Sequence, residues 1–340
     1  SLRTRMNFET MIGKALDNDP RLRFYNLFLE GRDLLNIFTV RIGRQPLFTP
    51  ISGGLFDGIN IKATYSDYSL TAFYGGNLPA FQKFEFLKDI EDNFVMGARF
   101  DATPIENLNL AISYFDKNFK PMDYETLRLD DDLDPVRILI MQKSNQFKFL
   151  SGSVNYEMPG VFDIYSSYEY DLNYRQQSKI EANGKVWITD NIGINGYYNW
   201  REPKIRYNSI FSIFNFGHTQ EYEGGIDYKI NSDYTVFGKF GYVEFQDENS
   251  SRLTLGATTK FGSVSYRKNL GYAGELDNIS VYAAKSFLKG LITPSIGVAY
   301  TTYKLSKDAE ANNITSLLGG VNYRPWKTWS FDLQGQFFNN

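Results

Sequence analysis

Apolar and polar side chains alternate along nearly the whole chain, in segments of about ten residues joined by links that are alternately short and long. Around residue 98, for example, Phe94, Met96, Ala98 and Phe100 fall on one face, whereas charged Arg99 falls on the other. A period of two residues is the period of a β-strand. A strand that crosses a membrane needs about 9–11 residues, with one face toward lipid and the other toward water. The pattern therefore predicts transmembrane strands.

The segments give an ordered set of expected strands. Because single-chain bacterial barrels have even numbers of strands, we expect roughly 18–20 in one closed antiparallel transmembrane β-barrel. An additional strand could lie beyond Asn340, within 116–145 or within 201–220, where residues 209–216 resemble a strand. The expected strands are residues 2–11, 21–30, 35–43, 58–66, 68–75, 93–102, 107–115, 146–157, 161–171, 177–188, 191–200, 218–230, 233–245, 251–261, 263–270, 278–287, 291–302, 313–323 and 328–338.

The links carry the evidence for sidedness. Short links contain Gly, Pro, Asn or Asp, which supply the backbone angles of tight hairpins. Long links, among them 44–57, 76–92, 116–145 and 201–217, fall between the short ones. Short turns on one rim and long loops on the other are typical of outer-membrane barrels. We therefore expect residues 1–340 to form a single barrel domain. Because residue 1 falls within an alternating segment, we also expect the sequence to start inside a mature protein, after its signal peptide.

Composition agrees with a barrel and excludes several other classes. Tyr (24) and Phe (28) are abundant, as the aromatic girdles at two membrane interfaces require. No apolar run approaches the roughly 18 residues of a membrane helix. The absence of cysteine excludes disulfides and thiolate sites. The net charge of −3 disfavours nucleic acid as a partner. We expect no cofactor.

The alternation also predicts which side chains face a water-filled lumen. A charge on the lipid face costs about 2–4 kcal/mol near the membrane midplane, so charged strand residues should point inward. Ile61, Leu110, Ile194, Val298 and Leu333 should point outward. Both signs of charge occur, which predicts a pore without strong ion preference; alternatively, each of these residues is simply solvated. The candidate pore-lining residues within the expected strands are Lys62, Arg99, Asp101, Asp227, Lys239, Lys260, Arg267 and Asp332.

One motif stands out from the general pattern. Arg41-Ile-Gly-Arg-Gln-Pro46 is followed by Gly-Gly-Leu-Phe-Asp57-Gly58. This arrangement resembles porin-like outer-membrane barrels, including alginate-export-type channels, over residues 35–75. The resemblance implies a barrel that passes polar or anionic solutes, with Arg41 and Arg44 near a constriction and Asp57 close to them. Alternatively, Arg44 and Asp57 attach the intervening link to the barrel wall by charge-assisted hydrogen bonds.

The remaining candidate sites are weaker. The acidic residues of link 116–145 supply oxygen ligands of the kind that calcium prefers, but without EF-hand spacing. They could equally be bridged to lipopolysaccharide by divalent ions or be solvated. His218 is the only histidine and has no serine beside it, so we expect neither a zinc site nor an enzyme. The weak calcium candidates are Asp130, Asp131, Asp132 and Asp134.

These patterns lead to two functional hypotheses. The first is a porin of the bacterial outer membrane for passive diffusion of small polar or charged solutes, narrowed by links 76–92 or 116–145. The second is a structural barrel that encloses a partner, such as a multihaem cytochrome or a secretion plug. The expected partners are outer-membrane lipid and lipopolysaccharide, small polar solutes, and either further copies of the chain or a plug protein.

Overall fold

A computed structural model describes residues 1–9, 21–49, 51–78, 90–120, 124–129, 135–140, 147–204, 217–246, 248–271, 274–305, 309–326 and 328–339. Antiparallel β-strands make up most of this part of the chain. A three-residue 3-10 turn lies at Leu288–Gly290. Over the described ranges, no helix is both long and apolar enough to span a membrane. The prediction of an all-β antiparallel fold is confirmed.

The chain divides into two compact units. Unit 1 comprises Ser1–Tyr156, Ser166–Ile180 and Glu202–Phe216, and unit 2 comprises Glu157–Tyr165, Glu181–Arg201 and Gly217–Asn340. The expectation of a single domain over residues 1–340 stays a prediction.

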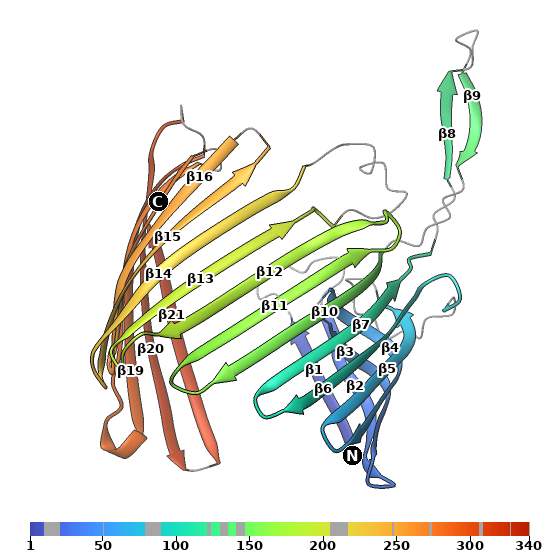
Figure 1. The fold of residues 1–340 in the computed structure, drawn as a ribbon, viewed down its shortest axis with the longest axis horizontal. Coiled ribbons are helices and arrows are strands. Elements are labelled where there is room, and N and C mark those ends of the chain that lie inside the picture. Colours follow the sequence, from blue (N-terminus) through green and yellow to red (C-terminus); the bar gives the residue numbers. More distant parts are fainter. Residues whose placement is uncertain are drawn as a thin grey trace. The chain divides into compact units, whose positions relative to one another are not determined.

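Unit 1 is shown from blue to green in Figure 1; each strand from β1 to β6 pairs with the next one, and β7 pairs with β10. In addition to these strands, β8 and β9 form a separate two-stranded hairpin. The strands are β1 (Leu2–Glu9), β2 (Arg21–Leu34), β3 (Phe38–Phe48), β4 (Gly53–Tyr65), β5 (Tyr68–Asn77), β6 (Phe94–Ile105), β7 (Leu108–Lys117), β8 (Tyr124–Leu129), β9 (Pro135–Ile140) and β10 (Phe147–Met158), with parts of β11 (Phe162–Asp171) and β12 (Gln176–Trp187).

Unit 2 continues the same scheme, shown from yellow-green to red in Figure 1. Each strand from β13 onward pairs antiparallel with the next. The strands are β13 (Ile192–Arg201), β14 (Thr219–Asn231), β15 (Tyr234–Phe245), β16 (Glu248–Thr259), β17 (Gly262–Gly271), β18 (Glu275–Ala284), β19 (Ile292–Lys304), β20 (Asn312–Trp326) and β21 (Trp329–Asn339).

Among the described residues, nineteen strands belong to one sheet, and each expected strand overlaps one of them. The number lies within the expected range of 18–20, although it is odd where an even number was expected. Within the described residues, no ladder joins the first strand to the last, so closure into a barrel stays a prediction. Link 116–145, one of the places where a further strand was considered, contains the β8–β9 hairpin, which forms a sheet of its own instead of joining the main sheet. The candidate strand at 209–216 lies outside the described residues.

The expected long link 44–57 is wrong. β3 and β4 extend through it, and only residues 49–52 separate them. Pro46 and the Gly53-Gly54 pair resembled a loop in the sequence, yet Pro46 is paired with Leu55 in the ladder. Gly43 and Gly54 take φ values of +125° and +144°, which side chains rarely adopt, so glycine allows the ladder to continue. The turn between expected strands 21–30 and 35–43 also lies later than expected, at Leu35–Ile37.

The two faces of the sheet differ in a way that is inverted for a soluble protein. In unit 1, Leu29 and Ile42 are 63% and 53% exposed, whereas the adjacent Phe28 and Glu30 are 6% and 4% exposed. In unit 2, Ile226 is 57% exposed, whereas the neighbouring carboxylates of Glu223 and Asp227 are 15% and 14% exposed. In both units, therefore, these carboxylates on the charged face are shielded, whereas aliphatic side chains on the opposite face are open. We call these the polar face and the apolar face of each unit.

An apolar cluster also occupies part of the polar face of unit 1. The ladders place Phe56, Val95, Phe115 and Phe149 on the face that includes Glu30, and all four are nearly inaccessible. Leu47 and Ile51 complete the cluster, at the end of β3 and in the short β3–β4 link. This end of the polar face is therefore packed, and its opposite end carries the charges.

The pairing of β4 with β5 depends on two glycines that face each other, and this gives a first prediction. A Cβ on Gly58 would overlap the Tyr74 carbonyl oxygen and lie 2.5 Å from Gly75 Cα. We expect Gly58→Val to destabilise the fold by about 1–3 kcal/mol or more, because backbone atoms cannot move aside. The measurement is the refolded fraction in detergent together with the thermal unfolding midpoint.

Gly224 provides the matched control, because no atom lies within 4 Å of its Cβ position. Gly224→Val should refold like the unaltered protein. Equal refolding and equal midpoints for Gly58→Val would contradict the close approach of β4 and β5.

Candidate functional site

Of the six predicted pore-lining residues in unit 1, four lie on its polar face. The ladders pair Arg41 with Asn60, Lys62 with Thr71, and Thr71 with Arg99, so these side chains share one face. Asp101 lies two residues beyond Arg99 on the same face, and the two form an ion pair of 2.7 Å. Ile61 and Leu110 fall on the opposite face.

Arg44 and Asp57 are brought together, but not on that face. They are direct ladder partners, and the register places Asp57 with Ile59 and Ile61. Arg44 Nε and Nη2 donate to the two carboxylate oxygens of Asp57 at 2.9 and 2.8 Å. Both side chains are nearly buried. The motif in the sequence suggested that this pair attaches the link between the two residues to the barrel wall. Instead, the pair joins two adjacent strands, β3 and β4, with two parallel hydrogen bonds.

Glu30 organises the charged end of this polar face, and sequence reasoning missed it. Its carboxylate is fully shielded and lies within 3.1 Å of nitrogen atoms of Arg3, Arg32 and Arg41, one from each of the strands β1 to β3. The stretch Gly31-Arg32-Asp33 had suggested a turn, although β2 extends to Leu34. The alternation itself could have found the group, since Glu30 and Arg32 both share a face with Phe28.

A cavity of about 210 Å³ lies on the same face. Its lining includes Asn60, Thr71, Phe73 and the Arg99–Asp101 ion pair. Pro46, Leu47 and Thr49 also contribute to the lining, so the end of β3 borders the cavity. The cavity thus places polar side chains beside the aromatic ring of Phe73. The charges of Arg99 and Asp101 in its wall cancel each other.

Lys204 connects the link after β13 to the polar face of unit 1. Its Nζ lies 2.7 Å from Glu169 Oε2 and donates to the Ile51 carbonyl oxygen at 3.1 Å. It also lies 5.4 Å from the centre of the Phe149 ring. The Glu169 side chain is almost fully buried, whereas that of Lys204 is 32% exposed. The expected inward links, 76–92 and 116–145, lie partly outside the described residues, and no sequence signal pointed to Lys204.

In unit 2, Asp227, Lys239, Arg267 and Asp332 all lie on the polar face according to the ladder registers, whereas Ile194, Val298 and Leu333 lie on the apolar face. Lys260 is placed differently. It follows the end of β16 in a tight turn and pairs with Asp233 of another turn at 2.8 Å. The hydrogen bond from Lys260 holds the pKa of Asp233 below its usual value, and the same contact raises the pKa of Lys260.

Ion pairs link three neighbouring strands of this polar face. Arg252 Nη2 lies 2.6 Å from carboxylate oxygens of both Glu221 and Glu223. Lys239 also approaches Glu223, at 3.5 Å. Acidic side chains thus come from β14 and basic ones from β15 and β16. The charges are largely compensated locally, which holds the side chains in place while leaving a polar surface.

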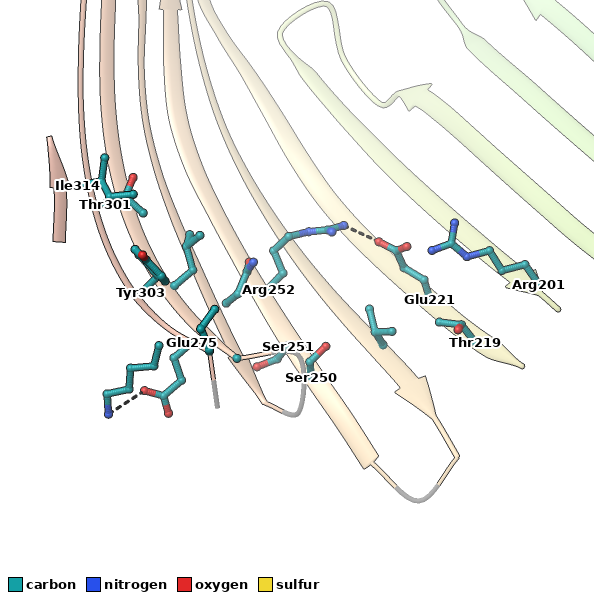
Figure 2. Close-up of a pocket in the computed structure, with 16 residues that line it drawn as sticks. Arg201, Thr219, Glu221, Ser250, Ser251, Arg252, Glu275, Thr301, Tyr303 and Ile314 are labelled. Atoms are coloured by element: carbon teal, nitrogen blue, oxygen red, sulfur yellow. Dashed lines mark hydrogen bonds and ion pairs between the residues drawn. The ribbon is translucent and has the colours of Figure 1, made fainter. Parts of the chain in front are cut away.

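Two cavities adjoin this network. The larger, of about 670 Å³, lies at the ends of the strands where the long links begin, and Figure 2 shows Arg201 extending toward Glu221 in it. Ser250, Ser251 and Thr301 add hydroxyl groups to its lining. The second, of about 480 Å³, shares Glu221 and Arg252 with the first and continues toward Lys185 and Asn195. The two cavities therefore form a continuous stretch of polar surface on this face.

The remaining candidates carry no site in the described residues. Asp130, Asp131, Asp132 and Asp134 lie outside the described residues. His218 stacks on Trp200 at 5.3 Å and contacts Gln220. Among the residues that the structure describes, no group of three or more acidic or histidine side chains is arranged to hold a metal ion.

Comparisons with known proteins add a fold likeness only. No family model matches the chain, and no curated protein matches it by sequence. The solved structure of OccAB4 from Acinetobacter baumannii aligns over 99% of this chain and 91% of its own, at 10% identity and a TM-score of 0.44. A mutant porin of Rh. blastica aligns over 87% and 91% of the two chains, at 12% identity and a TM-score of 0.39.

The P pilus usher PapC translocation pore aligns over 94% of this chain and 84% of its own, at 8% identity and a TM-score of 0.43. At these scores the likeness assigns neither a family nor a function.

The Arg44–Asp57 pair gives a second prediction. Arg44→Gln leaves a nearly buried carboxylate without its charged partner, which costs about 3–5 kcal/mol. We expect a lower unfolding midpoint, measured by circular dichroism in detergent. The double variant Arg44→Gln, Asp57→Asn should recover part of the loss, because no unpaired charge remains. A double variant no more stable than Arg44→Gln would show that the pair itself is not the cause.

Proposed function

We propose that this chain is a β-barrel channel of the bacterial outer membrane, through which small polar or charged solutes diffuse passively. The observation that carries this proposal is the inverted exposure of the two faces. Open aliphatic side chains would contact lipid, and shielded charges would face a wet lumen. A soluble sheet would bury its aliphatic face and expose its charges.

Closure of the sheet is part of this proposal. An exposed sheet edge inside a bilayer leaves backbone groups without partners, at several kcal/mol each. A closed barrel removes such edges. We therefore propose that the first and last strands pair in the membrane, with outer-membrane lipid and lipopolysaccharide around the apolar face.

Constriction of the lumen in unit 1 is supported by the apolar cluster and by Lys204. The β3–β4 link and the segment from Glu202 to Lys204 both lie against the polar face, where they occupy space that a solute would otherwise pass through. In unit 2 the polar face retains its cavities. The mixture of charges there suits polar solutes of either sign.

The alternative hypothesis of a sheath around a partner protein has less support. A sheath should present a smooth lumen of small uncharged side chains to its contents. Here the polar face of unit 2 carries Arg252 with two carboxylates, and that of unit 1 carries Glu30 with three arginines. These groups favour water and dissolved solutes as the contents.

The third prediction tests the channel itself. Folded protein added to a planar lipid bilayer should give discrete, long-lived conductance steps, because each inserted barrel adds one water-filled path. Protein denatured before addition is the control. Folded protein that inserts into the bilayer without conductance would exclude the channel and favour the sheath.

The fourth prediction concerns the constriction. Lys204→Met keeps the length of the side chain but removes its ion pair with Glu169 and its bond to Ile51. We expect larger open-channel noise or conductance, since the segment near residue 204 would no longer be held against the wall. Lys260→Met, in an exposed turn, is the matched control. Identical single-channel records for Lys204→Met and the unaltered protein would remove Lys204 from the constriction.

A further inference from the structure

Three arginines surround a single buried carboxylate on the polar face of unit 1. The Glu30 side chain is 0% exposed, whereas those of Arg3, Arg32 and Arg41 are 51%, 54% and 41% exposed. The carboxylate therefore lies beneath the guanidinium groups, which form the surface that solvent meets. Such an arrangement places several like charges together, which is unfavourable unless something compensates them.

All three arginines approach Glu30 through the same atom. Nε of Arg32 and of Arg3 lie 2.7 and 3.1 Å from Oε2, and Nε of Arg41 lies 2.9 Å from Oε1. The hydrogen bonds of Arg32 and Arg41 to Glu30 are donated by Nε, and each guanidinium also carries two terminal amino groups that can donate to a further acceptor. Over the described part of the chain, none of the three has another carboxylate partner.

The local charge does not balance. Three guanidinium groups against one carboxylate leave two net positive charges. Asp101, an acidic residue of β6 on this face, is already paired with Arg99. Lys62, exposed and on the same face, adds a further positive charge. The site therefore combines an excess of positive charge with several N–H donors close together.

We propose that Arg3, Arg32 and Arg41 form a binding site for a tetrahedral dianion of the phosphate or sulfate type, free or as the terminal group of a solute. A dianion matches the excess of two charges, and its oxygens accept forked hydrogen bonds from three directions. The proposal deepens the proposed channel function, on which it rests for the route by which the solute arrives. Glu30 is a positioning residue, because it fixes each fork from below.

The competing explanation is a clamp that only ties β1, β2 and β3 together. A clamp needs the Nε contacts and nothing more, whereas a dianion site needs the terminal amino groups. Arg32→Lys separates the two, since an ammonium group can still pair with Glu30 and preserves the charge but has no fork. Arg32→Gln removes both the charge and the fork.

The first experiment measures binding without requiring transport, and it is the fifth prediction. Inorganic phosphate is titrated calorimetrically into the folded, detergent-solubilised protein, with potassium chloride at equal ionic strength as the reference. We expect saturable binding with a Kd in the millimolar range, about tenfold weaker or worse in Arg32→Gln. Arg32→Lys should also weaken binding while folding normally.

Arg137→Gln is the matched control. Arg137 is an exposed arginine of the β8–β9 hairpin, and its Nη1 lies 3.7 Å from Glu125 Oε2. Its phosphate affinity should not change. No saturable heat with the unaltered protein, or equal affinities for it and for Arg32→Lys, would overturn the site. If Arg32→Gln fails to refold, the comparison with Arg32→Lys decides the question alone.

A second measurement separates this site from the channel. Phosphate should reduce the single-channel chloride current saturably in the unaltered protein and not in Arg32→Lys. Phosphate binding without any conductance would support the site and contradict the channel. Conductance without phosphate binding would support the channel and overturn the site. Glycerol 3-phosphate, if it binds as tightly as inorganic phosphate, identifies a terminal phosphate as sufficient; much weaker binding identifies the free ion.

Discussion

The pleat of the β-strand is the constraint on which the rest of this molecule depends. It sends successive side chains to opposite faces, so one alternating sequence produces two surfaces with opposite chemistry. Here aliphatic side chains such as Leu29 and Ile226 lie on the open face, and Glu30 and Asp227 lie on the shielded one. In water, the exposed aliphatic side chains would not contribute to stability through burial. Against lipid it satisfies both faces and leaves the backbone ladders to bond each other.

Charges on the shielded faces are arranged in different ways in the two units. In unit 2, acidic side chains of β14 meet basic ones of β15 and β16, and the charges compensate one another. In unit 1, three arginines converge on one carboxylate and an excess remains. Compensated pairs leave a polar surface with little net charge, whereas an excess of one charge attracts ions of the opposite sign. Salt should weaken the exposed parts of both arrangements.

Most of the fold followed from the sequence, because alternation over ten residues is a local signal. Expected strand positions overlap all nineteen strands of the main sheet. The errors have a common cause, since Pro46, Gly53 and Gly31 resembled chain breakers although the ladders accommodate them. Acidic residues similarly hid the β8–β9 hairpin, which has apolar residues on both of its strands.

The site was less predictable than the fold. Alternation placed Lys62, Arg99, Asp227 and Asp332 on the polar faces, but it could not indicate which charges meet. Arg3, Glu30 and Arg41 come together only through the registers of β1, β2 and β3. The contacts of Lys204 with Ile51 and Glu169 are not encoded in any strand period.

Lys204 also has a consequence for the time course of folding. It bonds to a carbonyl group 153 residues earlier in the chain. That carbonyl belongs to the link between two strands that pair locally and therefore can form early. Closing so long a loop is slow, because its entropy must be lost before the contact stabilises anything. The hairpins of unit 1 should consequently form before Lys204 reaches them. Until then the ring of Phe149, which Lys204 Nζ contacts in the folded protein, should stay accessible to solvent.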